Sequence, residues 1–314
     1  MYGYDNYQKV KEQIEKRREC AIREAEARDA ELRIESREIR EIDAELTGTG
    51  LLLFKTACSG GDLGAIKERN AALMKRRREV LSGLGYPEDY SEIKYFCPIC
   101  CDTGYDGSRL CSCFREELIK ENIRSSGIGN LIEKQSFDNF DLSIYEDEAI
   151  RKEMAHNLKE AKKYATEFKR DSKNLLLIGT TGTGKTHLTT AIAKTVIENG
   201  FEVIYDSAQN IVAAFEYDRF KSGYGQYEAR GEKYLECELL ILDDLGTEFS
   251  NQFTVSCIYN LLNTRLNKGL PTVISTNLGA GELLNRYEDR IYSRILGQDT
   301  VVLRFLGKDN RLSR

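Results

Sequence analysis

A glycine-rich turn between an apolar run and a helix-forming run constrains this chain more than any other feature. The turn, Gly179–Thr186, fits the pattern G-x-x-x-x-G-K-[ST] in full; it follows the apolar run Leu175–Ile178 and opens residues 185–198, where we expect a helix. A strand that leads through such a turn into a helix is the context in which this pattern binds phosphate. The glycines let the backbone wrap an anion closely, and N–H groups at the helix N-terminus stabilise it.

Each residue of the turn has an expected role in holding a nucleoside triphosphate. Lys185 reaches the β- and γ-phosphates, and the Thr186 hydroxyl ligates Mg²⁺. The alternative is a chance match in a turn rich in Gly and Thr, and the flanking strand and helix argue against it. The residues expected to contact the nucleotide here are Gly179, Thr180, Thr181, Gly182, Thr183, Gly184, Lys185 and Thr186.

Two further apolar runs end in polar side chains. Leu239–Leu242 ends in Asp243 and Asp244, and Thr272–Ser275 leads to Asn277. Ligands of parallel sheets bind at the carboxyl ends of strands. Asp243 is therefore expected to hold Mg²⁺, and Asp244 to orient or deprotonate an attacking water. Asn277 would hold that water or contact the γ-phosphate, although an isolated Asn there would be a turn residue. Many related sites carry Glu at the second acidic position, so the shorter Asp244 predicts slow hydrolysis.

Helices and strands alternate from about residue 150 onward. We expect a helix over 147–170, the helix over 185–198, a polar helical region after 202–205, a helix over 253–267, and a final helix and strand. The expected strands are 175–178, 202–205, 239–242 and 272–275. Continuous apolar strands that alternate with helices indicate a parallel sheet covered on both faces, which is an α/β fold.

The N-terminal third is charged and helical in pattern. Residues 8–47 contain no Pro or Gly and are dense in Glu, Arg, Lys and Ala, so they predict one long helix. Apolar residues recur every seven positions, at Ala25, Leu32, Ile39 and Leu46. This partial heptad seam, which is typical of a coiled coil, indicates either a partner-binding or oligomerising arm or a helix folded back on the next one. We expect a break at Thr47–Gly50 and a second helix over 63–81, with Asp62 as its N-cap.

Four cysteines form two tight pairs. Cys97 and Cys100 have C-x-x-C spacing, and Cys111 and Cys113 have C-x-C spacing. Thiolates on two such knuckles can surround one tetrahedral Zn²⁺, with no open position for catalysis. A redox C-x-x-C is the competing interpretation, but it needs no second pair. Cys101 could replace Cys100 as a ligand, although the spacing favours Cys100.

Composition excludes several classes of protein. At 314 residues the chain is long enough for two domains, and its net charge of −5 excludes coating of nucleic acid by bulk charge. Nine cysteines, an odd number, argue against a secreted disulfide framework. The first twenty residues have no apolar signal region, and no run approaches 18 apolar residues. We therefore expect a cytoplasmic protein that does not enter the membrane.

Three segments together resemble a known family. Residues 182–188 (GTGKTHL), 242–248 (LDDLGTE) and 274–277 (ISTN) resemble the DnaC/DnaI-type bacterial helicase loaders, which are AAA+ ATPases, and equally the ATPase subunits of IstB-type transposition systems. The resemblance covers roughly residues 135–314. It implies a P-loop AAA+ sheet domain that binds ATP with Mg²⁺ and hydrolyses it. Loaders of the DnaI type also carry a similar zinc module before the ATPase, where it serves partner recognition or restrains DNA binding.

The same resemblance assigns roles to three residues outside the turn pattern. Arg294, in the run 290–294, would be the arginine finger that reaches the γ-phosphate bound by a neighbouring subunit, and Arg311 would be the sensor arginine acting in cis. Spacing alone would make these arginines part of a solvated basic tail. His187 is typical of the family beside the turn, where it would contact the nucleotide region or cap or pack beneath the loop.

The implied function is loading of a replicative hexameric helicase onto single-stranded DNA at replication initiation, with self-association through ATP-bridged interfaces. The alternatives are an IstB-type ATPase that regulates transposition, against which the zinc module and long N-terminal arm count, and a mobile-element ATP-binding adaptor with little hydrolysis, which Asp244 suggests. We expect a helical partner-binding region over 1–94, a zinc knuckle over 95–116, a connector over 117–137 and the AAA+ domain over 138–314.

Contact with DNA has one candidate segment. Arg219, Phe220 and Lys221 lie among tyrosines, an alternation of basic and aromatic side chains that single-strand binding uses. Those tyrosines are Tyr217, Tyr224 and Tyr227. Nearby acids dilute the pattern, so an ordinary helix is the alternative; these acids are Glu216, Asp218 and Glu228.

Overall fold

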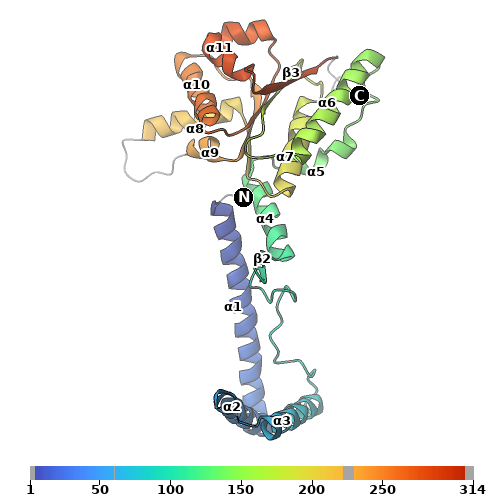
Figure 1. Ribbon diagram of the computed structural model, residues 1–314, viewed down its shortest axis with the longest axis vertical. Coiled ribbons are helices and arrows are strands. Elements are labelled where there is room, and N and C mark those ends of the chain that lie inside the picture. The colour runs from blue at the N-terminus through green and yellow to red at the C-terminus, as the bar shows by residue number, and fades with distance from the viewer. Residues whose placement is uncertain (1–3, 60, 222–229, 308–314) are drawn as a thin grey trace. The chain divides into compact units, whose positions relative to one another are not determined.

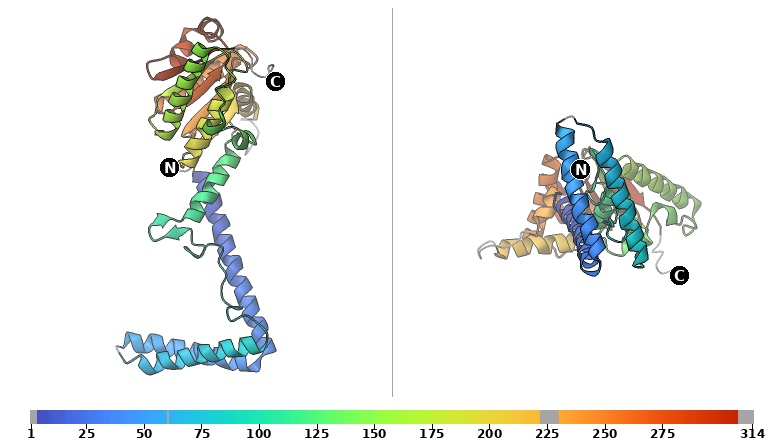
Figure 2. Two further views of the ribbon diagram at one scale, coloured as in Figure 1. Left: turned by 90° about the vertical axis from the view of Figure 1, so that its right-hand side faces the viewer. Right: turned by 90° about the horizontal axis from the view of Figure 1, so that it is seen from below.

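A computed structural model describes residues 4–59, 61–221 and 230–307 of the chain (Figures 1 and 2). By their contacts they form two compact units, one from residues up to Val10 together with Arg115 onward, and one from Lys11–Phe114. Each unit is described by itself. Arg311 and the acid Glu228, together with Tyr224 and Tyr227, lie outside the described residues.

The larger unit is built on a five-stranded parallel sheet with the order β4-β5-β6-β3-β7. Its strands are β3 (Asn174–Gly179), β4 (Val203–Ser207), β5 (Leu239–Leu245), β6 (Thr272–Thr276) and β7 (Thr300–Phe305). The predicted α/β fold with a parallel sheet is confirmed. The continuous apolar runs of β3 and β5 are buried because helices cover both faces of the sheet.

Helices from different parts of the sequence cover the two faces. The helices are α4 (Ser112–Ser125), α5 (Leu131–Lys134), α6 (Glu148–Thr166), α7 (Lys185–Glu198), α8 (Ala208–Lys221), α9 (Glu232–Glu236), α10 (Gln252–Asn267) and α11 (Ala280–Ile295), and a 3₁₀ turn spans Phe137–Asn139. Side chains of α6 and α7 pack in one core with Leu175 and Leu177 of β3, whereas α8, α10 and α11 pack in another with Leu176. The alternation along β3 follows from the two-residue period of a strand.

The outer edge of β4 is covered by the segment that follows α4. The backbone N–H of Tyr205 donates to the carbonyl of Ser126 at 2.6 Å. Next to it, Gly127 has a φ of +83°, and a Cβ there would lie 2.5 Å from the carbonyl oxygen of Tyr205. Only glycine fits this close approach, and the covered strand does not present an unpaired edge at this point.

The smaller unit is mostly helical. It contains most of α1 (Tyr4–Glu35), then α2 (Arg37–Cys58) and α3 (Gly64–Gly83), and a short antiparallel pair, β1 (Tyr105–Asp106) and β2 (Arg109–Leu110). Helices α2 and α3 pack against each other as a hairpin. Asp62 accepts a hydrogen bond from the N–H of Gly64 at 2.9 Å, although the residue at the N-cap position of α3 is Leu63.

The predicted break at Thr47–Gly50 is wrong, and so is the single helix over 8–47. The chain breaks at Ser36, whose hydroxyl caps α2 by accepting a hydrogen bond from the N–H of Ile39 at 3.2 Å. Residues 47–50 lie inside α2, where the hydroxyls of Thr47 and Thr49 donate to preceding backbone carbonyls of the helix. Such local bonds are compatible with a helix, so two glycines were not enough to end it.

The heptad seam does not run along one helix. Leu32 lies on α1 and Ile39 on α2, and both pack with Leu81 of α3 in one small core. Leu32 and Ile39 are therefore buried by a helix of their own chain, as expected if the long helix folds back on the next one.

None of the helices in the described part of the chain is both long and apolar enough to cross a membrane.

Candidate nucleotide site and cysteine cluster

The glycine-rich turn has the strand–turn–helix context that its sequence predicts. It leaves β3 at Gly179 and enters α7 at Lys185, with Gly184 at the N-cap position. Gly182 and Gly184 have φ values of +76° and +94°, which side chains other than glycine rarely adopt. A Cβ on Gly179 would collide with the carbonyl oxygen of Phe305. The turn is therefore fixed by glycine in a conformation that directs backbone N–H groups to an anion.

Lys185 lies folded against the turn. Its ammonium donates to the carbonyls of Gly179 at 2.7 Å and Thr180 at 2.8 Å, and the side chain is buried. The hydroxyl of Thr183 donates to the same Thr180 carbonyl at 2.7 Å. A positive charge is thus held within the turn, where it can neutralise a bound phosphate. Thr186 follows in the first turn of α7 and is half-buried.

A segment before α6 supports the turn, and sequence reasoning did not assign it a role. The hydroxyl of Tyr145 donates to the carbonyl of Thr183 at 2.9 Å, and Phe140 packs edge-on against His187 with ring centroids 5.1 Å apart. The Nε2 atom of His187 lies 2.9 Å from the carbonyl oxygen of Ser136 and 3.0 Å from an Asn139 oxygen. The described contacts of His187 are therefore with this supporting segment. The sequence feature that could have identified this segment was the pair Phe140 and Tyr145 in a polar stretch before the helix expected over 147–170.

Asp243, at the end of β5, accepts a hydroxyl hydrogen bond on each carboxylate oxygen. Tyr205 of β4 donates to Oδ2 at 2.6 Å, and Ser275 of β6 donates to Oδ1. The Ser275 hydroxyl also accepts from the backbone N–H of Asp244 at 2.9 Å. Burial raises the pKa of Tyr205 far above its usual range, and the neighbouring Asp243 charge raises it further. Tyr205 is therefore a neutral donor, and Asp243 is held between the two neighbouring strands.

Asp244 turns out of the sheet. It is exposed, has a φ of +53°, and lies where the register between β5 and β6 is interrupted. Asp is among the few non-glycine residues that adopt this conformation. Asn277 is also exposed and directly follows β6, which lies between β5 and β3 in the sheet. The structure thus brings the turn, Asp243, Asp244 and Asn277 to one edge of the sheet.

A buried glutamate anchors the loop that follows β5, and sequence reasoning gave it no role. Glu248 accepts a hydrogen bond from the N–H of Gly246 at 2.8 Å, and others from Arg286 and the hydroxyl of Tyr287 on α11. Its side chain is only 1% exposed. A buried carboxylate needs such partners, so this loop and α11 are held together. The sequence feature that could have identified Glu248 was its place at the end of the segment 242–248, on which the family resemblance partly rests.

Arg294 is held on α10 of its own chain. Its guanidinium donates to the Asn263 side chain at 2.8 and 2.9 Å and to the Tyr259 hydroxyl at 3.1 Å, and it lies 4.5 Å from the centre of the Tyr259 ring. These partners belong to the face of the sheet opposite α7. The structure therefore does not bring Arg294 to the turn of the same chain.

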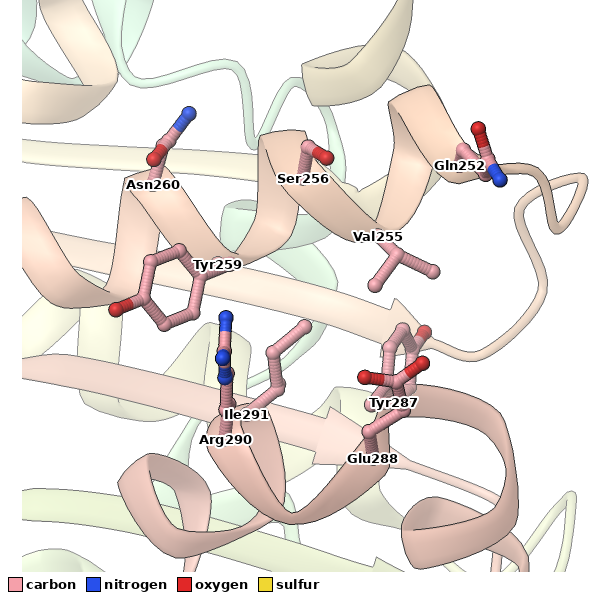
Figure 3. Close-up of a pocket in the computed structure, with 9 residues that line it drawn as sticks. All are labelled: Gln252, Val255, Ser256, Tyr259, Asn260, Tyr287, Glu288, Arg290 and Ile291. Atoms are coloured by element: carbon pink, nitrogen blue, oxygen red, sulfur yellow. The ribbon is translucent and has the colours of Figure 1, made fainter.

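A pocket of about 510 Å³ lies between α10 and α11 beside these residues (Figure 3). Tyr259 projects from α10 towards Arg290 and Ile291 of α11. Within α11 the backbone of Glu288 has φ 60° and ψ 171°, so the helix is kinked just before the run 290–294. A non-glycine residue in this region of φ/ψ space is strained. Arg290 and Arg294 therefore follow a change in the direction of the helix.

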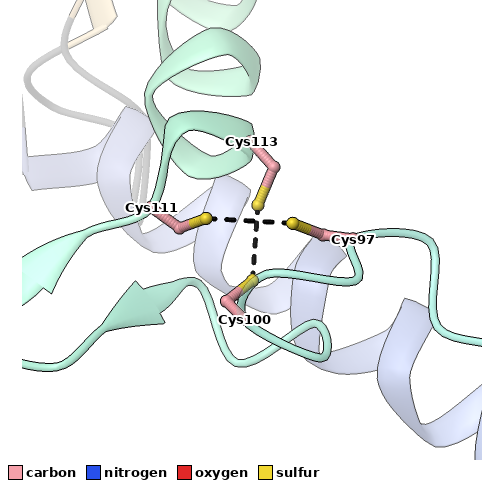
Figure 4. Close-up of side chains that lie close together, drawn as sticks. All are labelled: Cys97, Cys100, Cys111 and Cys113. Atoms are coloured by element: carbon pink, nitrogen blue, oxygen red, sulfur yellow. Dashed lines mark hydrogen bonds between the residues drawn. The ribbon is translucent and has the colours of Figure 1, made fainter.

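Four cysteines converge in the smaller unit (Figure 4). The Sγ atoms of Cys97, Cys100, Cys111 and Cys113 all lie within 4.8 Å of one another, with 3.8 Å between Cys97 and Cys111 and 3.5 Å between Cys100 and Cys113. A tetrahedral Zn²⁺ with Zn–S bonds of about 2.3 Å separates its sulfurs by about 3.8 Å. Cys101 is exposed and its thiol faces the carbonyl of Pro98 instead. The set fits a metal ion.

The chemistry of the thiols agrees with this geometry. The backbone N–H of Cys100 lowers the pKa of Cys97 to about 7, whereas burial raises the pKa values of Cys100 and Cys113. Metal ligation requires the thiolate form of cysteine, which a bound cation stabilises. The carboxylate of Asp102 supports the first knuckle by accepting from the N–H groups of Phe96 at 2.8 Å and Cys97 at 2.9 Å.

Comparison with solved structures finds partial similarity. A crystal structure of the DnaC helicase loader aligns with a TM-score of 0.48 and 19% identity, covering 56% of this chain and 98% of that one. A crystal structure of DnaI aligns with a TM-score of 0.45 and 22% identity, covering 59% and 95%.

Comparison with sequences identifies the family. The replicative helicase loader DnaC of Escherichia coli (strain K12) is 23% identical over 181 residues, 58% of this chain and 71% of that protein. A putative insertion sequence ATP-binding protein of Sinorhizobium fredii (strain NBRC 101917 / NGR234) is 33% identical over 109 residues, 35% of each chain. The family model described as IstB-like ATP binding protein matches residues 121–299, more than half of the chain. The chain therefore belongs to the family of IstB-like ATP-binding proteins.

Proposed function

We propose that this protein is a slow, Mg²⁺-dependent AAA+ ATPase of the cytoplasm that loads a hexameric replicative helicase onto single-stranded DNA. One observation carries the proposal: the glycine-rich turn, the acidic end of β5 and Asn277 meet at one sheet edge, in a chain that also has a separate helical and cysteine-bearing unit. The matched relative DnaC, named a replicative helicase loader, supports this choice of partner.

The proposed chemistry divides the site into binding and reacting groups. Lys185 and the N-terminal N–H groups of α7 bind the phosphates, and the oxygen donors Thr186 and Asp243 would hold Mg²⁺. When bound, Mg²⁺ neutralises charge on the phosphates. Asp244 orients or deprotonates the water, and Asn277 holds that water or contacts the γ-phosphate. Asp244 is exposed and has a positive φ, and only its short side chain is available to reach the water. This supports slow turnover.

Arg294 would complete the site of a neighbouring subunit. Its guanidinium stabilises the charge that spreads over the transferring phosphoryl group. To do so it must exchange its hydrogen bonds with Asn263 and Tyr259 for a phosphate oxygen. ATP would therefore lie between subunits in the active assembly.

The four-cysteine cluster would hold one structural Zn²⁺. The two knuckles then fix the segment 95–116, and a site with four thiolate ligands has no position for a substrate. We assign partner binding to the helical region over 1–94 together with this zinc knuckle, a connecting role to 117–137, and ATP binding to 138–314.

Single-stranded DNA has a candidate surface on α8 and the start of α10. Phe220 is 70% exposed, and Phe249, in the loop after β5, is 84% exposed. The guanidinium of Arg219 lies 5.2 Å from the centre of the Phe253 ring. Exposed aromatic rings stack on bases, and arginine binds the backbone phosphates. Because Phe249 follows the acidic end of β5, this surface lies close in the chain to the nucleotide site.

A second candidate function is regulation of DNA transposition. The match to a putative insertion sequence ATP-binding protein favours it. That function would use the same ATPase site on duplex DNA. An adaptor that binds ATP with little hydrolysis is a third possibility, which Asp244 in the second acidic position supports.

Loading assays with the full chain and a hexameric helicase test the proposal. The helicase is offered a circular single strand carrying a labelled complementary oligonucleotide, which it unwinds only after it has been loaded. We expect ATP-dependent unwinding that requires this protein, and binding to single strands that exceeds binding to duplex at the same salt concentration. Preference for duplex without helicase retention would reject loading and favour the transposition role. Asp243→Asn is the matched inactive control.

A further inference from the structure

A buried tyrosine connects the carboxylate of Asp243 to the helix that follows the glycine-rich turn. Tyr205 of β4 is 8% exposed, and its Oη lies 2.6 Å from Oδ2 of Asp243 and 3.3 Å from the hydroxyl of Thr189 on α7. The only hydroxyl proton of Tyr205 goes to the carboxylate, because a carboxylate can only accept. Thr189 is therefore the donor when those two hydroxyls bond.

The hydrogen bonds to Asp243 come from uncharged hydroxyl groups on its two neighbouring strands. Both donors, Tyr205 and Ser275, are neutral hydroxyls. Asp243 is only 7% exposed. The buried site thus presents an oriented oxygen ligand to a cation.

The backbone of Tyr205 is fixed from the other side. Its N–H donates to Ser126 at 2.6 Å, and its carbonyl lies against Gly127, which has no side chain. The Tyr205 ring also belongs to the core with α7. The hydroxyl is therefore held in place by the strand, the core and the covering segment, and it can define where the Asp243 carboxylate lies.

We propose that Tyr205 is a positioning residue for Mg²⁺ at Asp243, acting through its hydrogen bond to Oδ2. The inference rests on the proposed ATPase function. Outer-shell partners orient a ligating side chain, and their loss weakens metal binding by about 10- to 100-fold. Tyr205 would fix the orientation of the carboxylate, whose oxygens each accept one hydroxyl hydrogen bond and each keep a further lone pair for a metal ion.

Substitution Tyr205→Phe in the full chain removes only the hydroxyl. The measurement is binding of a fluorescent ATP analogue at increasing Mg²⁺, and separately without Mg²⁺. We expect the Mg²⁺ concentration for half-maximal binding to rise about tenfold, with binding in the absence of Mg²⁺ unchanged. The Mg²⁺ dependence of hydrolysis should shift by the same factor, and rate at saturating Mg²⁺ should recover.

The chain offers a closely matched control. Tyr234 is 2% exposed and donates its hydroxyl to Asp206 at 2.7 Å, so Tyr234→Phe deletes the same kind of buried tyrosine–carboxylate bond elsewhere. We expect both variants to lose similar thermal stability, but only Tyr205→Phe to change the Mg²⁺ dependence. Equal Mg²⁺ shifts in both would show a general structural effect and overturn the inference.

The remaining outcomes separate this inference from the function on which it rests. A wild-type chain that binds no nucleotide at any Mg²⁺ concentration rejects the ATPase proposal itself. Wild-type Mg²⁺-dependent binding that Tyr205→Phe leaves unchanged rejects only the positioning role. If Tyr205→Phe does not fold, Tyr205→Met replaces it, because it removes the same hydroxyl and keeps an apolar side chain in the core; an unaltered Mg²⁺ curve in that variant also overturns the inference.

Discussion

Arg294 has all its described hydrogen bonds with residues of its own chain, on α10 and α11. The Tyr259 ring lies against the guanidinium, and one side-chain oxygen of Asn263 accepts hydrogen bonds from its Nε and from one terminal nitrogen. A finger that acts on a neighbouring subunit must leave these partners. If Arg294 acts as proposed, its effect on hydrolysis is separable from nucleotide binding, which we assign to the turn that follows β3.

Mixing two inactive variants tests whether Arg294 acts across subunits. Arg294→Ala should keep nucleotide binding and lower hydrolysis by about 10³-fold, the usual contribution of an arginine finger. Lys185→Ala should lose binding. Mixed with Arg294→Ala, the Lys185→Ala subunits supply intact arginines, so hydrolysis should partly return. The rate of phosphate release by the mixture is the measurement.

The control for this mixture is Arg290→Ala, which removes an exposed arginine from the same helix. It should keep most of the activity. If the mixture stays inactive, or if Arg294→Ala loses binding and hydrolysis equally, a role in trans is contradicted.

At the scale of elements, the strand–turn–helix at Gly179–Lys185 and the acidic end of β5 were predictable because their signals are local in sequence. Tyr205 and Ser275 were not, since they meet Asp243 across 38 and 32 residues of chain. A tyrosine inside an apolar strand looks like any core residue until the sheet order is known. The helix break at Ser36 was missed because two glycines suggested a stronger stop than a single capping serine.

The cysteine cluster supports a prediction about metal content. The wild type should contain about one Zn²⁺ per chain, and Cys113→Ser should lose most of it because a tetrahedral site needs all four ligands. Cys101→Ser is the matched control, since its exposed thiol faces away from the cluster, and should retain the metal. Metal analysis after zinc-replete expression gives the answer. Loss of zinc in Cys101→Ser with retention in Cys113→Ser would reverse the ligand assignment.

The segment covering β4 supports a prediction about stability. Gly127→Ala places a Cβ against the Tyr205 carbonyl and forces alanine to a φ of +83°, so we expect a loss of about 1–3 kcal/mol in the free energy of unfolding. Gly281→Ala, in α11 with no atom within 4 Å of the added Cβ, should be neutral or slightly stabilising. Chemical denaturation of both variants measures this. Equal stability of the two would contradict the close approach.

At the scale of the whole molecule, the two units are not consecutive in sequence. The first residues of α1 belong to the larger unit, which we call the ATP-binding unit because the family match lies in it. Asn6 donates to Asn122 at 2.9 Å and to Ser125 at 2.7 Å, and Lys9 pairs with Glu121 at 3.8 Å. The helical and cysteine-bearing unit lies between them in the chain. Sequence patterns could not reveal this, because α1 has no change of composition near residue 10.

Partner binding can be assigned to a fragment. Residues 1–135 contain the helical region and the cysteine cluster. They also contain α1, through which the chain leaves the ATP-binding unit, and α4, through which it returns. We expect this fragment to retain a hexameric helicase in a pull-down, and Cys113→Ser to weaken that retention if the knuckle takes part. Retention by the full chain but not by the folded fragment, checked by circular dichroism, would move the partner surface to the ATP-binding unit.

The split arrangement of the chain determines how the smaller unit can be removed. In the terms of protein engineering it is an insertion rather than an N-terminal extension, since the chain enters it after Val10 and returns at Arg115. Truncating the N-terminus would also delete Asn6 and Lys9 and leave Asn122 and Glu121 without these partners. A deletion that keeps these contacts must instead join Val10 to Arg115. Because the insertion has two covalent connections to the ATP-binding unit, a force that a partner applies to the insertion is transmitted through both.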